Sequence, residues 1–176
     1  MTPSAEVNFR VEKKECDCKN SSYVPEDFVG KWTLDKDSFQ NFLQKSVGDD
    51  TSIDRISGDI FLTIDHLKNF KYELIQTEVI AHKDDILMQI KADGIATKAH
   101  IEAFNTSKFC LKNITSDANI KITLQFPGQP PAESESQIDF SFDEGVTFES
   151  LLFDKVLKVK RELSNGEVVD FIFYKI

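Results

Sequence analysis

The sequence predicts an all-β fold: a closed antiparallel up-and-down β-barrel of about ten strands, with a short helix-turn-helix lid after the first strand. Two observations support this prediction. From Asp59 onward, apolar residues recur mainly at every second position, as in half-buried strands. These segments are separated by short polar breaks, and closing such a meander into a barrel removes its exposed edges. Before Asp59, two brief segments show helical spacing instead.

The 176 residues are enough for one domain with a core, which we expect to occupy residues 25–176. Residues 1–24 are polar and charge-dense, and we interpret them as an N-terminal extension outside the fold. The first strand is expected within 28–34, because alternate residues of this segment are apolar or small: Phe28, Gly30, Trp32 and Leu34.

The two lid helices are predicted between this strand and Asp59. Asp37 and Ser38 are good N-cap residues, and Gly48 is a typical helix stop. Between them, apolar residues recur at helical spacing: Phe39, Phe42, Leu43 and Val47. A second helix is expected from Asp50 to Gly58, with Ile53 and Ile56 on its apolar face. Both helices are too weakly apolar to stand alone, so we expect them at the barrel mouth.

The remaining strands are predicted by period-two alternation and by the breaks between them. The expected ranges are 60–66, 69–80, 85–91, 95–104, 108–114, 119–126, 137–143, 146–153, 155–163 and 167–175. Asp93-Gly94 and Asp117 are expected to be turns between strands, and 127–136 a surface loop because it contains prolines and acidic residues.

The last two strands form the clearest predicted hairpin, since Asn165-Gly166 is a strong signal for a two-residue loop. This loop would pair Leu163 with Val168 and Arg161 with Asp170. One face would then carry Leu157, Val159, Arg161, Leu163, Val168, Asp170, Ile172 and Tyr174. We expect that face to point inward, because three charged residues lie on the opposite one: Lys158, Lys160 and Glu162.

Charge and composition exclude several functions and partners. With 21 Lys+Arg against 30 Asp+Glu, the net charge of −9 argues against nucleic-acid binding. No apolar run approaches the roughly 20 residues of a membrane-spanning helix, so stable membrane insertion is not expected. We predict a cytoplasmic location with reduced thiols at Cys16, Cys18 and Cys110, because no signal segment is present as written. The alternative is secretion after removal of a signal peptide, which three Asn-x-Ser/Thr triplets favour.

Residues 28–34 (FVGKWTL) and 37–43 (DSFQNFL) resemble the opening of the intracellular fatty-acid-binding proteins, relatives of the lipocalins within the calycin superfamily. The final segment, 160–176, resembles their closing hairpin. This resemblance implies a barrel with an apolar interior, capped by two helices. Many members of that family grip a carboxylate with an Arg two residues before the last Tyr. Tyr174 matches this Tyr, but Ile172 stands at the Arg position.

A ligand site is therefore predicted inside the barrel. Arg161 would meet a ligand carboxylate, and Tyr174 would add a hydroxyl donor. The other candidate contacts are Ile172, Val159, Phe39, Phe42, Leu43 and Ile56. The alternative for Arg161 is a cross-strand ion pair with Asp170, and the alternative for the lid residues is simple core packing.

Other chemistry has little support in the sequence. The three histidines (His66, His82 and His100) lack the spacing of a metal site, and no catalytic motif is present, so we expect neither an enzyme nor a cofactor. The first functional hypothesis is non-enzymatic binding and transport of a fatty acid or similar hydrophobic ligand. The alternative is a structural or protein-interaction module with a filled barrel, binding a partner through its acidic surface or N-terminal tail.

Overall fold

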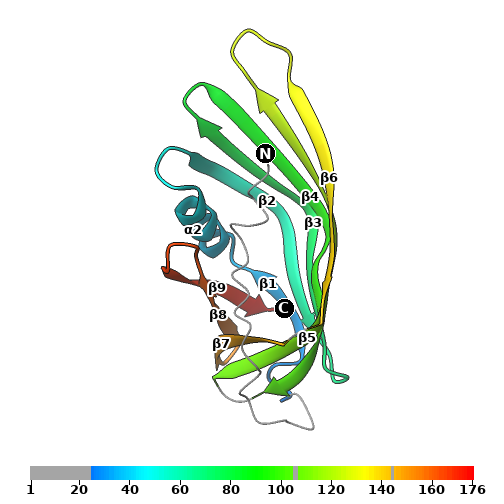
Figure 1. Cartoon of the computed structure of the whole chain (residues 1–176). Helices are drawn as coiled ribbons and strands as arrows, with labels where there is room; N and C mark the ends of the chain where they lie inside the picture. The colour runs from blue at the N-terminus through cyan, green and yellow to red at the C-terminus, as the bar shows by residue number, and fades with distance from the viewer. Residues whose placement is uncertain (1–24, 105–106, 144) are drawn as a thin grey trace.

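The computed structural model describes residues 25–104, 107–143 and 145–176, and these form nine strands and one helix (Figure 1). In chain order they are β1 (Gly30–Leu34), α2 (Lys36–Val47), β2 (Ser52–Ile64), β3 (Asn69–Lys83), β4 (Ile86–Phe104), β5 (Lys108–Gln125), β6 (Ala132–Phe142), β7 (Val146–Phe153), β8 (Val156–Glu162) and β9 (Val168–Lys175).

Eight of these strands close into an antiparallel barrel, in the order β4-β3-β2-β1-β9-β8-β7-β5, with β4 and β5 paired to complete the ring. Strand β6 pairs with β5 outside the ring. Strands β2 to β6 have 11 to 19 residues, whereas β1 and β7 to β9 have 5 to 8. The long strands therefore extend beyond the short ones as a curved wall, and α2 lies on its concave side (Figure 1). The predicted barrel and the helix after its first strand are confirmed.

Nine strands replace the expected ten or so because two predicted breaks lie inside continuous strands. Asp93-Gly94 belongs to β4 and Asp117 to β5, at a point where the register between the two strands shifts. A Cβ on Gly94 would lie 2.6 Å from the carbonyl oxygen of Asp117, so this glycine permits close backbone approach rather than a turn. In addition, β6 begins at Ala132, inside the segment predicted to be a loop.

The predicted second helix is wrong, because Ile53 and Ile56 belong to β2. Ile53 pairs with Ala81 while Arg55 pairs with Ile80, so Asp54 is an extra residue in a β-bulge. The bulge places residues three apart on the same face, and that spacing imitates a helix. Gly58 lies within the same strand instead of ending a helix.

Helix α2 is fixed by two glutamine side chains to the start of β2, on the edge that faces away from β3 and lies beyond the end of β1. Gln40 Nε2 donates to the carbonyl of Ile53 at 2.8 Å, and the N–H of Ile53 donates to Gln44 Oε1 at 2.9 Å. The Asp35 N-cap accepts from the Ser38 N–H at 3.1 Å, and Gly48, with a φ of 83°, follows the last turn. The helix therefore satisfies backbone groups that would otherwise lie on an open strand edge.

The predicted register of the final hairpin is wrong by one residue. Leu163, not Ser164, pairs with Glu167, since the Leu163 N–H donates to the Glu167 carbonyl at 2.8 Å. The Gly166 N–H donates to the Leu163 carbonyl at 3.0 Å, and Gly166 has a φ of 88°. These are the features of a three-residue loop with a glycine bulge. The one-residue shift moves every side chain of β9 to the face opposite the predicted one.

The barrel core is formed by large apolar side chains from all sides of the ring. Trp32 is fully buried, and its indole N–H donates to the Phe28 carbonyl at 3.1 Å. Phe28 packs edge-on against Phe104 and Phe109, with ring centroids 4.5 and 6.0 Å away. The other fully buried large side chains are Ile60, Leu62, Ile64, Ile101, Leu111, Leu157 and Leu163.

Candidate functional site

The inner face of β8 carries a cation in otherwise apolar surroundings. Leu157 and Val159 of this strand are buried in the core, and Arg161 follows on the same face. Its guanidinium carbon Cζ lies 5.2 Å from the ring centroid of Phe171 and 5.9 Å from those of Phe42 and Phe148. These distances are in the range of cation–π contacts. We call Arg161 with its three phenylalanine neighbours the arginine site.

Tyr72 of β3 is the second polar residue beside this site. Burial raises the pKa of its phenol well above the ordinary value, while the nearby Arg161 charge opposes that rise. Burial also lowers the pKa of Arg161, and Tyr72 opposes that change in turn. Both side chains are half-buried, and the two groups lie near enough to influence each other's pKa.

Helix α2 covers the arginine site. Phe42 and Phe39 pack edge-on against Phe171, with ring centroids 4.9 and 6.0 Å away. The first turn of the helix is held to β9, because the Ile172 N–H donates to Ser38 Oγ at 3.2 Å and the Asp35 N–H donates to the Ile172 carbonyl at 2.7 Å. The roof of the site is therefore anchored at its N-terminal end.

An apolar surface continues from the arginine site under α2. Phe39 and Leu43 pack against both the barrel core and a second apolar cluster on the long strands. The buried members of that cluster are Ile53, Ile56, Val79 and Ala81, and the half-buried Met88 and Ile90 pack against it. The helix thus covers both the arginine site and the apolar cluster of the long strands.

Six of the eight predicted contact residues lie on the inner side of this structure: Arg161, Val159, Phe39, Phe42, Leu43 and Ile56. The other two do not, because the register shift places Ile172 and Tyr174 on the outer face. Tyr174 is 44% exposed, so the predicted hydroxyl donor inside the barrel is wrong. The predicted ion-pair alternative is also wrong, since Asp170 lies opposite Lys160 on the outer face and Arg161 lies opposite Val169.

No protein-family model, curated protein or solved structure matches this chain. The geometry of the arginine site is therefore the basis for a functional proposal. Among the described residues, no helix is long and apolar enough to cross a membrane, and no three side chains of the metal-ligating types cluster together.

Three residues of the site were missed in the sequence: Tyr72, Phe148 and Phe171. Phe171 was assigned to the outer face by the incorrect hairpin register, which a three-residue loop at Ser164-Asn165-Gly166 would have corrected. Tyr72 and Phe148 each lie in a predicted strand. No local sequence pattern distinguishes an aromatic residue beside Arg161 from any other aromatic residue of the core. Only the strand order brings β3, β7 and β8 together around one interior.

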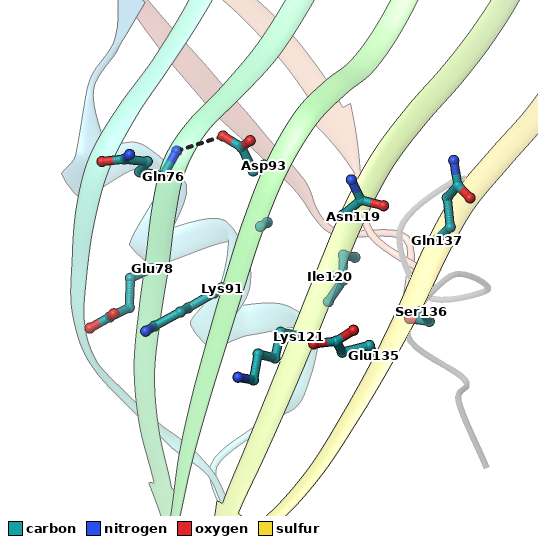
Figure 2. A pocket seen from close by; sticks show the side chains of 11 residues that line it. Gln76, Glu78, Lys91, Asp93, Asn119, Ile120, Lys121, Glu135, Ser136 and Gln137 are labelled. Atoms are coloured by element: carbon teal, nitrogen blue, oxygen red, sulfur yellow. Dashed lines mark hydrogen bonds between the residues drawn. The ribbon is translucent and has the colours of Figure 1, made fainter.

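A separate polar groove lies on the outer face of the long strands, with a volume of about 790 Å³. It crosses β3, β4, β5 and β6, and α2 is visible behind the sheet from this side (Figure 2). Register pairs align Glu78 with Lys91 and Lys121 with Glu135 across neighbouring strands. Figure 2 shows these side chains beside one another in one row, with Asp93, Asn119 and Gln137 in the next.

The polar groups of this groove largely bind one another. Lys121 Nζ lies 3.5 Å from Glu133 Oε2, and Gln89 Nε2 donates to Glu78 Oε2 at 3.0 Å. The Gln76 N–H donates to Asp93 Oδ1 at 3.0 Å. Lys91 and Lys121 are neighbours in the register of β4 and β5, and Glu78 and Glu135 flank them, so the groove carries charges of both signs. We favour the arginine site as the ligand site, because it joins a cation to an apolar surface.

Proposed function

We propose that this protein is a non-enzymatic carrier that binds an apolar small molecule with an anionic head group, such as a fatty acid. The head group would lie at Arg161, and the tail under α2 along Phe39, Leu43 and Ile56. The observation that carries this proposal is the position of Arg161: a guanidinium inside the barrel, ringed by Phe42, Phe148 and Phe171.

Physical chemistry supports an anionic ligand at this position. A guanidinium has five N–H donors in a planar fork, and it can bind a carboxylate through two parallel hydrogen bonds. Arg161 is half-buried, so water competes less there than at the outer surface and each charge-assisted bond is stronger. A tyrosine phenol is protonated at neutral pH, and burial raises the pKa of Tyr72 further, so its hydroxyl is available as a further donor.

The apolar surface under α2 supports a hydrophobic tail. Burying a methylene group contributes about 0.8 kcal/mol, so a chain of several methylenes supplies most of the affinity while the arginine selects the head group. Ser38 anchors the helix that covers this surface to β9, and Gln40 and Gln44 anchor it to the start of β2. Its apolar side chains Phe39 and Leu43 contact the surface below by packing. Entry of a ligand would require a small displacement of α2.

The alternative is an interaction module whose barrel holds no ligand. It is supported by the close packing of Trp32, Phe28 and Phe109 in the core beside β1. In that case Arg161 would serve the packing of the core and would bind no ligand. The two functions predict different affinities for a fatty acid and for the alcohol of the same chain length.

We predict that the protein binds a fatty acid about tenfold or more tightly than the alcohol of equal chain length, because only the acid presents a carboxylate to Arg161. Displacement of a fluorescent fatty-acid probe, titrated separately with palmitic acid and hexadecanol at pH 7.5, measures both affinities. Equal affinities would contradict the head-group contact. Failure of both ligands and of the probe to bind delipidated protein would overturn the carrier function and favour the interaction module.

A further inference from the structure

Strand β6 has an open edge in the part of the chain that the structure describes. The ring closes through the pairing of β4 with β5, so β6 joins it from outside and pairs with β5. Figure 1 shows β6 at the margin of the wall of long strands. In an antiparallel pair every second residue points its N–H and C=O away from the partner strand, so roughly five residues of β6 direct these groups toward the open edge.

The open edge of β6 is long and regular enough to accept another strand. β6 has 11 residues, and its register with β5 continues from Phe142 to Ala132 without a bulge. The strand contains no proline and no lysine, two residue types that commonly prevent a further strand from pairing with an edge. Residues 132–137 are all exposed. Its backbone is therefore accessible to a partner.

The outer face of β6 is acidic. Glu133, Glu135 and Asp139 share this face, because side chains two residues apart in a strand point to the same side. Lys121 Nζ lies 3.5 Å from Glu133 Oε2. Glu135 and Asp139 form no ion pair with another residue that the structure describes. Asp139 also lies opposite Asp117 in the register, and opposed like charges destabilise a pair of strands, so a cation from an added strand would relieve this repulsion.

The inner face of β6 carries small side chains beside a larger apolar surface. Ala132, Ser134 and Ser136 share this face, and all three are exposed. Ser134 is the register partner of Ile122 of β5, which in turn pairs with Ile90 beside the apolar cluster under α2. Ile122 is half-buried. A large apolar side chain on an added strand would reach over the small residues of β6 toward this surface.

We propose that the open edge of β6 is a docking site for an extended segment of another protein, in which Lys or Arg alternates with large apolar residues. The segment adds to the sheet as a further strand, with its cations beside Glu135 and Asp139 and its apolar side chains on the inner face. A second copy of this chain fits less well, because antiparallel pairing of two β6 strands about Gln137 sets Glu135 of each opposite Asp139 of the other. This docking site lies outside the barrel and requires nothing of the arginine site.

Two synthetic peptides of equal composition test the docking site: KFKFKFKF, which separates cations and apolar residues onto two faces of a strand, and KKFFKKFF, which mixes them. The full-length protein is produced in an oxidising secretory host, because Cys110 is disulfide-bonded and the expected reduced thiol is wrong for this residue. We expect fluorescence anisotropy of the labelled peptides to show about tenfold or tighter binding of KFKFKFKF. Hydrogen exchange followed by mass spectrometry should show slower exchange of β6 amides when this peptide binds.

A double variant with Glu135→Lys and Asp139→Lys should bind KFKFKFKF about tenfold or more weakly, because both carboxylates are replaced by cations. The matched control combines Asp49→Lys and Asp50→Lys, two exposed positions in the turn after α2. This control changes the net charge by the same amount and should bind the peptide as the wild type does.

Three results would overturn the proposed docking site. Equal affinities for the two peptides, or equal losses of affinity in the two double variants, would show that net charge alone attracts the peptide. Failure of both peptides to bind would show that the edge accepts no such strand. A dimer in sedimentation equilibrium, with β6 amides that exchange slowly before peptide is added, would show that a second copy of the chain occupies the edge.

Discussion

Replacing Gly58 with alanine is expected to lower the free energy of unfolding by about 3 kcal/mol or more. Gly58 has a φ of 89°, and a Cβ there would lie 2.2 Å from the carbonyl oxygen of Gln76 and 2.7 Å from the Cα of Thr77. These are backbone atoms of the paired strand β3, so they cannot move without breaking the β2–β3 ladder at its irregular register. Urea unfolding followed by circular dichroism measures the loss.

Gly48→Ala is the matched control for this prediction. Gly48 has a similar φ of 83° but no atom within 4 Å of the position of an added Cβ. Its replacement therefore carries the backbone strain of a positive φ with an extended ψ, roughly 1–3 kcal/mol, without the steric clash. Equal losses of unfolding free energy in Gly58→Ala and Gly48→Ala would show that the close approach of β2 and β3 adds no cost to a side chain at position 58.

Arg161→Met is expected to reduce affinity for a fatty acid about 100-fold while leaving affinity for the matching alcohol unchanged. The loss follows because methionine has a similar length but no charge or N–H donor to meet a carboxylate. We also expect the fold to survive, because an apolar side chain of similar volume removes the cost of burying a charge. The same displacement titration, with the acid and the alcohol, measures both affinities.

Arg55→Met provides the control for charge alone. Arg55 lies on β2 with 68% of its side chain exposed, and it is 3.8 Å from Glu78 in the outer row of charges. This variant changes the net charge by the same amount as Arg161→Met, so it should bind both ligands as the wild type does. A comparable loss of fatty-acid binding in both variants would show that long-range charge causes the preference for the acid. That result would contradict a direct contact between the carboxylate and Arg161.

The barrel was predictable because its signals are local and repeated. Period-two alternation extends over most of the chain after Asp59, and the Gly30-Lys31-Trp32 strand is followed at once by a capped amphipathic segment. The errors occurred where backbone irregularities alter the usual periods. The bulge at Asp54 gave Ile53 and Ile56 a helical spacing. Gly94 permits a close approach of β5 inside one continuous strand, where a turn was expected.

The candidate site was predictable only in part, because it depends on register and on strand order. Arg161 and the helix residues were correctly predicted to face inward, because local periodicity determines which face of a strand or helix each residue occupies. Tyr174 and Ile172 were misplaced by a single residue of loop length at Gly166, since one residue decides which face of β9 points inward. Tyr72 and Phe148 come from strands far apart in the chain, and no local pattern links them to Arg161.

The central claim, a carboxylate held at Arg161 inside the barrel, is tested most directly by NMR of a bound fatty acid labelled with ¹³C at its carboxyl carbon. A carboxyl group ordinarily titrates at roughly pH 4–5, and burial without a cation raises that value. Contact with Arg161 should keep the bound carboxylate ionised, so its chemical shift should stay constant between pH 8 and pH 5. In Arg161→Met the same resonance should titrate within this range. A wild-type resonance that titrates with a midpoint above pH 5 would contradict the account.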